Sequence, residues 1–471
     1  MSSRRLDQQS AQRPEHAGRA GSRLPLIALC LGYFMVTMDA TVVNTALPAI
    51  GRDLSAPVSG LQWITAGYTL VFACLLLTGG SLGDRLGSRR VFLVGVAVFT
   101  LASAACGLSP GLGVLIGARA VQGVGAALAV PTSLALINAS YPDRDQRARA
   151  IGMWGGLGGV AAGLGPVLGG MLTNWVGWPA IFFINVPIGI AAIALTSKHV
   201  VAPAPTRRAG PDLPGQVLSM VAVAALAYGL IEAQSQGWTS PRILGAFIVA
   251  IAAAVGFVLV ERRGQHPMLP LRLFGDREFS GSLLIGAAIN LGFYGELFLL
   301  ALYFQDVRHF SPLLAGLAML PQPGIASLAS WLAGRHTARI GPRPVMLVGL
   351  TVGSLGLLTT IFAAADTPYW LLVLPLLAIG FGTAYTMPAA TAATIEAAPA
   401  NQAGTASGAL NASRQVGSTL GVAIFGTLAA GSASFMTGYH RSALVGGLVF
   451  AAGALIALVS GHRRGAADAP T

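Results

Sequence analysis

Two charged side chains lie inside long apolar stretches of this sequence, where a charge needs a physical reason. Asp39 lies in the stretch 25–50 and Arg119 in the stretch 112–139. At the centre of a lipid bilayer an ionised aspartate costs about 2.5–3.5 kcal/mol by insertion scales, so such a residue marks a functional site by default. A carboxyl group that loses a proton on one side of a membrane and regains it on the other can drive other work. The alternative for Asp39 is an acid that only hydrogen-bonds a neighbouring helix.

Arg119 is the natural partner of such an acid. A guanidinium stays charged, so Arg119 has to face an acid or an aqueous cavity. Gln122, about one helical turn further on, can hydrogen-bond it. The alternative for Arg119 is a static ion pair. Arg414, in the stretch 402–430, is a similar supporting candidate, for which a position in water on the cytoplasmic side is equally open.

The composition indicates that transmembrane helices position these residues. The chain has 471 residues, of which 54% are hydrophobic and 10% charged, and its mean hydropathy is +0.68. Soluble domains carry roughly 25% charged residues, and a membrane span needs about 20 mostly apolar residues. The sequence therefore predicts an all-α polytopic membrane protein. Fourteen stretches qualify as transmembrane helices: 25–50, 61–82, 90–108, 112–139, 147–173, 179–197, 214–234, 243–262, 279–303, 312–334, 344–364, 369–396, 402–430 and 441–461.

The basic residues predict the orientation of these helices, because cytoplasmic loops are rich in Lys and Arg. Most of the 29 Lys and Arg fall on one side if both termini are cytoplasmic, with an N-terminal tail over 1–24 and a C-terminal tail over 462–471. The exceptions are Arg52, Arg242, Arg308 and Arg441 on the other side, and Arg119 and Arg414 within spans. The pI of about 10.4 thus follows from membrane topology, and no nucleic-acid partner is expected.

An internal repeat divides the chain. GSLGDRLGSRR (80–90) recurs weakly as GRHTARIGPRP (334–344), and GVGAALAVP (123–131) recurs as GFGTAYTMP (380–388). We therefore expect two related six-helix halves, 25–197 and 279–461, separated by a linker and two inserted helices over 198–278. Many secondary transporters are built from repeated halves around a midplane cavity. In this alignment Glu296 falls opposite Asp39, and it could bind a second proton, bind a cationic substrate or only pack helices.

Two further motifs predict moving parts. The run GMWGGLGGVAAGLGPVLGG (152–170) has to be helical in a bilayer, and its small residues let another helix approach closely. Its later part, Gly165, Pro166, Gly169 and Gly170, offers a bend point and indicates a seam between two bundles. In the basic turn 80–90, Arg89 and Arg90 are expected to anchor the cytoplasmic side, while Asp84 could pair with an arginine and a helix N-terminus to latch a gate.

Taken together, these motifs resemble the major facilitator superfamily, in its fourteen-helix drug:proton antiporter branch and its methylenomycin-resistance type of exporter. The resemblance covers nearly all of 25–460. It rests on MDATVVNTALP (38–48), GSLGDRLGSRR (80–90), RAVQGVGAA (119–127), GLGPVLGG (163–170), IFFINVPIG (181–189), SPLLAGLAMLP (311–321) and AGTASGALNASRQVGSTLGVA (403–423). Ala161 departs from the helix-five motif, which usually has glycine there, and Ala338 replaces the acid in the second loop copy.

The resemblance implies a role for each matching residue. It implies protonation at Asp39, proton transfer at Arg119, and antiport at Gly165, Pro166, Gly169 and Gly170. It also implies cytoplasmic gating by the loop motif, whose matching residues are Gly80, Asp84, Arg85, Gly87, Arg89 and Arg90.

The sequence thus predicts a proton-coupled exporter of antibiotics or other amphipathic drugs, working by alternating access in a bacterial cell membrane. Its expected partners are the small-molecule substrate, protons and the lipid bilayer, and it is expected to be a monomer. A phosphate-binding G-x-x-x-x-G-K-[ST] motif, a metal-ligand cluster and a nucleophile motif are all missing from the sequence. We therefore expect no enzyme activity, no cofactor and no ATP site. A proton-coupled importer on the same fold and a membrane sensor without transport are the alternatives.

Overall fold

The computed structural model describes residues 24–141, 143–201, 212–264, 269–399 and 402–460. The described residues fold into helices joined by short turns. The predicted C-terminal tail, the predicted N-terminal tail apart from Leu24, and 202–211 of the linker lie outside the described residues.

The N-terminal helices carry most of the residues that the sequence singles out. They are α1 (Leu24–Asp53), α2 (Val58–Leu86), α3 (Ser88–Gly107), α4 (Leu112–Ser140), α5 (Arg144–Trp175), α6 (Ala180–Phe183) and α7 (Asn185–His199). Two helices follow that belong to the predicted insertion, α8 (Leu213–Gln236) and α9 (Pro241–Arg263).

The remaining elements begin with η2 (Leu271–Gly275), α10 (Arg277–Leu302) and η3 (Tyr303–Val307). They continue with α11 (Pro312–Ala318), α12 (Pro321–Gly324), α13 (Ala326–Ile340), α14 (Pro342–Thr359) and η4 (Thr360–Phe362). They end with α15 (Tyr369–Glu396), α16 (Ala403–Ala430) and α17 (Phe435–Ser460).

Thirteen helical segments of the described chain are long and apolar enough to cross a membrane. Helix α16 is the fourteenth long helix; its 28 residues reach about 42 Å at 1.5 Å per residue. It falls below the hydropathy of the others because one stretch carries polar residues, among them Asn411, Arg414 and Gln415. The fold is therefore the all-α membrane bundle that the sequence predicts.

Two predicted spans are interrupted. The span predicted over 312–334 is present as one segment, Pro312–Ile340, but its helix is divided into α11, α12 and α13 around Pro321 and Pro323, because a proline cannot donate the backbone hydrogen bond that continues a helix. The stretch 179–197 is divided into α6 and α7 at Ile184. Helices α3 and α14, which correspond to the predicted spans 90–108 and 344–364, begin two residues earlier than predicted, at Ser88 and Pro342. Each begins directly after a glycine of positive φ, Gly87 and Gly341.

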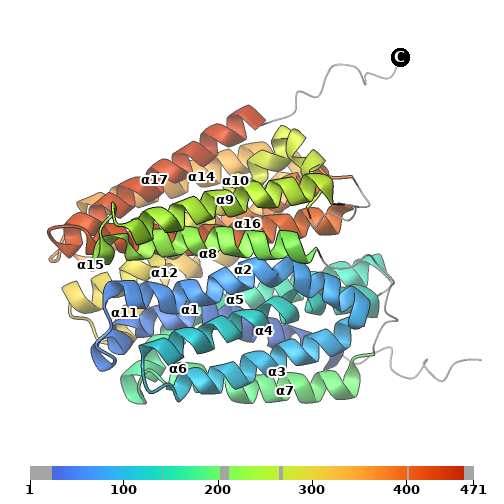
Figure 1. The fold of residues 1–471 in the computed structure, drawn as a ribbon, viewed down its shortest axis with the longest axis horizontal. Coiled ribbons are helices and arrows are strands. Elements are labelled where there is room, and N and C mark those ends of the chain that lie inside the picture. The colour runs from blue at the N-terminus through green and yellow to red at the C-terminus, as the bar shows by residue number, and fades with distance from the viewer. Residues whose placement is uncertain (1–23, 142, 202–211, 265–268, 400–401, 461–471) are drawn as a thin grey trace, which may run out of the picture.

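The helices form two groups with α8 along the seam between them (Figure 1). Helices α1 to α7 form one group, and α10 and α14 to α17 lie in the other. Helix α8 packs against α2 and α16, which belong to different groups. Trp63 Nε1 of α2 donates to Glu232 Oε1 of α8 at 3.0 Å, and Thr427 Oγ1 of α16 donates to the carbonyl of Leu230 at 2.7 Å.

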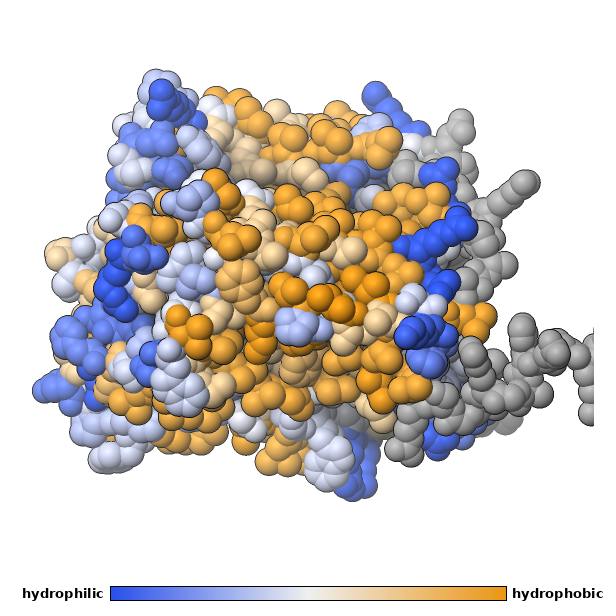
Figure 2. Space-filling model, turned by 90° about the horizontal axis from the view of Figure 1, so that it is seen from below, coloured by the Kyte–Doolittle hydropathy of each residue, from blue (hydrophilic) through white to orange (hydrophobic). Residues whose placement is uncertain are grey.

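The outer surface matches a membrane-embedded bundle. Figure 2 shows a broad band of hydrophobic residues between two hydrophilic ends. Backbone groups in lipid find no water to bond, so a helix that satisfies its own backbone is the stable form for these stretches.

Candidate functional site

Asp39 and Arg119 form an ion pair in the interior of the first helix group. Arg119 Nη1 of α4 donates to Asp39 Oδ2 of α1, and both side chains are almost completely buried. Arg119 also donates through Nε to the carbonyl of Ile64 at 3.1 Å, and its guanidinium lies 4.4 Å from the ring centroid of Tyr68. A buried ion pair needs such additional partners, because each charge has lost its hydration. The structure therefore brings together the two charged residues that the sequence places in different spans.

Three polar residues complete the surroundings of this pair. Gln122 Nε2 donates to Asp39 Oδ1 at 3.2 Å, and Gln122 Oε1 accepts from Arg119 Nη1 at 2.8 Å. Asn185 Nδ2, at the start of α7, donates to Asp39 Oδ1 at 2.8 Å. Ser103 Oγ of α3 accepts from Gln122 Nε2 at 2.6 Å. The carboxyl group of Asp39 is thus held by side chains from two helices besides its own.

Sequence reasoning assigned no role to Asn185 or Ser103. Asn185 lies in the quoted stretch IFFINVPIG, where an asparagine inside an apolar run was the available signal. Ser103 gave no such signal, because serines are common in membrane helices.

A large cavity of about 1300 Å³ lies beside this network. Val36, Thr37 and Ala40 of α1 line it together with Tyr68 of α2, so the cavity wall includes the direct chain neighbour of Asp39. The opposite wall comes from α10 and α16, with Asn290, Tyr294, Arg414 and Gln415 among its residues.

The cavity opens toward one end of the bundle. Its lining includes Asp84, Arg262 and Arg272, which lie at or beyond the ends of their helices on the side that the positive-inside rule assigns to the cytoplasm. In this orientation the conformer faces inward.

The opposite end is closed by the glycine-rich helix. Glycines of α5 contact α1 and α11 so closely that a side chain could not be accommodated: a Cβ at Gly165 would clash with Thr41 of α1, and a Cβ at Gly170 would clash with the carbonyl of Pro312 of α11. Pro166 contributes its carbonyl, which accepts from Thr45 Oγ1 at 3.1 Å. Gly169 faces Val42 and Thr45 in the same way.

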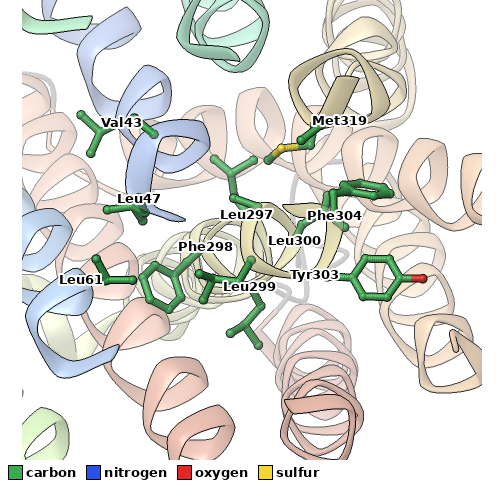
Figure 3. Packing of buried hydrophobic residues seen from close by; sticks show 14 of the residues in the cluster. Val43, Leu47, Leu61, Leu297, Phe298, Leu299, Leu300, Tyr303, Phe304 and Met319 are labelled. Carbon is green, nitrogen blue, oxygen red and sulfur yellow. The ribbon is translucent and has the colours of Figure 1, made fainter. Parts of the chain in front are cut away.

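Polar and apolar contacts between the two groups extend this closure. Gln305 Nε2 donates to the carbonyl of Thr45 at 2.8 Å, and Arg52 forms an exposed ion pair with Asp306 at 3.2 Å. A buried apolar cluster lies beside them. Figure 3 shows part of it, with Val43, Leu47 and Leu61 of the first group next to Leu297, Phe298, Leu299, Leu300, Tyr303, Phe304 and Met319.

The residues of the basic turn lie at the open end. Gly80 and Asp84 line the cavity, and Gly87 has a φ of +93°, which the sharp connection from α2 to α3 requires. Arg89 Nη2 donates to the carbonyl of Ser197 on α7 at 2.6 Å. The remaining two cations of the motif, Arg85 and Arg90, are exposed.

Glu296 is not among the residues that line the cavity. It is buried in α10, where Oε2 accepts from Gln322 Nε2 of α12 at 2.8 Å and Oε1 has no hydrogen-bond partner. Among the described residues, no ion pair joins Glu296 to a cation within 4.0 Å. Arg414, by contrast, lines the cavity. The structure thus brings Gln122 to the Asp39–Arg119 pair but leaves Glu296 and Arg414 in other places.

Aromatic side chains form part of the cavity wall. They are Tyr33, Tyr68, Phe72, Trp154 and Tyr294. Other aromatic residues lie elsewhere: Trp63 donates to Glu232 of α8, and Phe298 and Tyr303 belong to the apolar cluster. Among the described residues, no group of three or more His, Cys, Asp or Glu could hold a metal ion.

Comparison with known proteins shows relatives along almost the whole chain. The chain is 38% identical over 432 residues to the methylenomycin A resistance protein of Bacillus subtilis, covering 92% of each protein. It is 40% identical over 407 residues to the multidrug resistance protein Stp of Mycobacterium tuberculosis, covering 86% of this chain and 76% of that protein. It is also 38% identical over 409 residues to the tetracenomycin C resistance and export protein of Streptomyces glaucescens, covering 86% of this chain and 75% of that protein.

The fold has solved counterparts. The structure of the POT family transporter PepTSo aligns with a TM-score of 0.65 at 15% identity, covering 93% of this chain and 99% of that one, which shows a shared fold. The family model of the major facilitator superfamily matches residues 29–422. This chain therefore belongs to the major facilitator superfamily.

Proposed function

We propose that this protein exports antibiotics or other amphipathic drugs from a bacterial cell in exchange for protons, by alternating access. The observation that carries the proposal is the buried Asp39–Arg119 pair directly behind the wall of a cavity whose lining reaches one end of the bundle at Asp84, Arg262 and Arg272. Relatives whose names describe resistance to methylenomycin A and export of tetracenomycin C support the direction and the class of substrate.

The geometry suggests how protons and substrate exchange. In this inward-facing conformer Asp39 is paired with Arg119, which corresponds to the state after a proton has left. Protonation of Asp39 from the outside removes its charge and weakens the pair, so α1 and α4 lose the interaction that fixes them. Substrate in the cavity and a proton on Asp39 then favour opposite conformations, which is the thermodynamic requirement for exchange.

Glu296 is a second candidate for proton coupling, because an ionised carboxylate that is buried without a cation is costly. We further propose that Gly80, Asp84, Arg85, Gly87, Arg89 and Arg90 form the cytoplasmic gate. When the halves close at that end, Asp84 would move from the cavity mouth into the seam.

The same proposal specifies the energy source of transport and the oligomeric state of the protein. The proton gradient supplies the energy, so neither ATP nor a cofactor is required, and the protein acts as a transporter and not as an enzyme. It works as a monomer, because the cavity lies between helices of one chain. Import of a nutrient and sensing without transport are the competing functions, and the experiment below separates them.

The test is drug susceptibility in an efflux-deficient bacterial host that expresses the wild type or Asp39→Asn. The panel holds lipophilic cations, uncharged antibiotics and amphipathic acids. We expect the wild type to raise resistance to at least one class, and Asp39→Asn to return resistance to the level of the empty vector, because an amide stays neutral and cannot be ionised and protonated in turn near neutral pH.

The matched control is Asp366→Asn, which makes the same chemical change at an exposed acid in the turn before α15. It should keep the resistance of the wild type at equal expression. Equal resistance in wild type and Asp39→Asn would remove Asp39 from the mechanism, and no resistance to any compound would favour the importer or the sensor.

A further inference from the structure

Arg414 reaches the cavity from the middle of α16. Its aliphatic stem passes over Gly286 of α10, where an added Cβ would lie 3.2 Å from Arg414 Cγ. Nη1 donates to Asn411 Oδ1 at 3.3 Å and Nη2 lies 3.0 Å from the sulfur of Met387, which is a weak acceptor. Nε is buried and has no hydrogen-bond partner. The guanidinium therefore has donors to spare and no anionic partner within ion-pair distance among the described residues.

Other arginines in the bundle are better satisfied. Arg119 has a carboxylate, an amide oxygen and a backbone carbonyl. Arg343 donates through Nε to the carbonyl of Ala457 at 3.0 Å and through Nη2 to that of Leu458, where α17 ends. Arg414 has no comparable acceptor, so a structural role does not explain its charge.

The inner part of the cavity holds no acid that could balance this charge. Among the described lining residues, the acids are Asp84, Asp212 and Glu261, which lie at or near helix ends at the open side, as do the cations Arg262 and Arg272. Asp39, behind the opposite wall, is already paired with Arg119. Midway along its helices, the cavity therefore carries one uncompensated positive charge.

Neutral donors and aromatic surfaces surround that charge. Tyr33 of α1 and Tyr294 of α10 line the same cavity as Arg414. Tyr33 stacks on Trp154 of α5, with ring centroids 3.7 Å apart and 16° between the planes. An anion at Arg414 could accept from the guanidinium and from a tyrosine hydroxyl while its apolar body lies against these rings.

We propose that the cavity selects amphipathic carboxylates, with Arg414 binding the carboxylate group. The proposal rests on the exporter function above and narrows its substrate class from amphipathic drugs in general to those that carry an acid. A planar guanidinium binds a carboxylate through two parallel hydrogen bonds, and this geometry distinguishes it from the ammonium of lysine. A lipophilic cation gains nothing from this site and is repelled by it.

The test compares three compounds that share one aromatic body: 1-naphthylacetate, 1-naphthylacetamide and 1-naphthylmethylammonium. Binding to the purified protein in phosphatidylcholine nanodiscs is measured by equilibrium dialysis, with empty nanodiscs subtracted for partition into lipid. We expect the wild type to bind the acid most tightly. Arg414→Gln should weaken binding of the acid about 10- to 100-fold, since a hydrogen bond to a charged group is lost, and should leave binding of the amide unchanged.

Two further variants keep the result interpretable. Arg414→Lys retains the charge but not the forked geometry, so acid binding should fall less than in Arg414→Gln. Arg339→Gln removes the same charge from an exposed position at the end of α13, outside the cavity, and should bind all three compounds as the wild type does. Preserved amide binding also shows that a variant is folded.

Four results would overturn the proposal: binding of the amine at least as tight as that of the acid, no binding of the acid by the wild type at millimolar concentration, unchanged acid binding in Arg414→Gln, and equal loss of all three compounds in that variant. Failure here and failure of the exporter function are distinguishable. Resistance that depends on Asp39, combined with any of these results, leaves an exporter with another preference, whereas acid binding without resistance leaves a binding site without export.

Discussion

At the scale of single residues, Asp39 is held by three donors rather than by Arg119 alone. Gln122 and Asn185 both donate to Oδ1, while Arg119 donates to Oδ2. Hydrogen bonds to a charged group contribute more than those between neutral groups, and a network of this kind fixes the position of the carboxylate beside the cavity wall.

Asn185→Ala removes one of these donors, and we expect the initial rate of drug export at matched protein level to fall about 10- to 100-fold, which is the range for a lost hydrogen bond to a charged group. The rate is measured as drug uptake into inside-out vesicles. Asn174→Ala, at an exposed position near the end of α5, is the control and should transport normally. A normal rate in Asn185→Ala would show that Arg119 and Gln122 suffice.

The sequence was enough to find Asp39, Arg119 and Gln122, because a charge in an apolar span has few structural explanations. The sequence did not predict that Asn185 hydrogen-bonds Asp39. Spacing along one helix says which residues share a face, but the contact between α7 and α1 depends on how whole helices pack, and that is set by many small side chains at once. The partner of Glu296 was unpredictable for the same reason, since Gln322 reaches it only where the chain breaks at α12.

At the scale of elements, α5 does two different things along its length. Its second half, with Gly165 and Gly170, is wedged between α1 and α11. Its first half makes fewer such contacts: added Cβ atoms at Gly152, Gly155 and Gly159 would meet no atom within 4 Å, although one at Gly158 would clash with the ring of Tyr33. The glycine run therefore closes one end of the seam in this conformer and leaves the other end free to close in the opposite one.

The substitution Gly170→Leu tests whether the close contact between α5 and α11 closes this end of the seam. The added side chain would force the carbonyl of Pro312 away, so we expect loss of resistance and labelling of a cysteine placed at Thr45 by an impermeant maleimide from outside the cell. Gly117→Leu is the matched control, because a Cβ at that helical glycine of α4 meets no neighbour. If Gly170→Leu leaves both resistance and labelling unchanged, the contact between α5 and α11 is not the seal.

At the scale of the whole molecule, the two groups touch at one end and separate at the other, where the cavity opens. Helix α8 spans the seam and contacts both groups, so it has to accommodate their movement. The long apolar stretches predicted the all-α membrane bundle from sequence, because each depends only on composition over about 20 residues. The conformer itself was not predictable, since one sequence has to support both states.

A covalent link between the two helix groups at the closed end should stop the transport cycle. We expect a short, reducible bis-thiosulfonate linker between Arg52→Cys and Asp306→Cys to block export and a reducing agent to restore it, because the partners of this exposed ion pair have to separate in the outward-facing state. Each single-cysteine variant should be unaffected, and the native Cys30, Cys74 and Cys106 are buried. Full export by the linked protein would mean that this end does not open.

The central claim, exchange of protons for drug through Asp39, is tested most directly in inside-out vesicles that hold an imposed proton gradient. A fluorescent amine reports the gradient while a drug from the susceptibility panel is added. We predict that the drug dissipates the gradient with the wild type and has no effect with Asp39→Asn, although both proteins are present at equal amount. Drug uptake by the wild type without any proton movement, or the same proton movement in Asp39→Asn, would contradict the account.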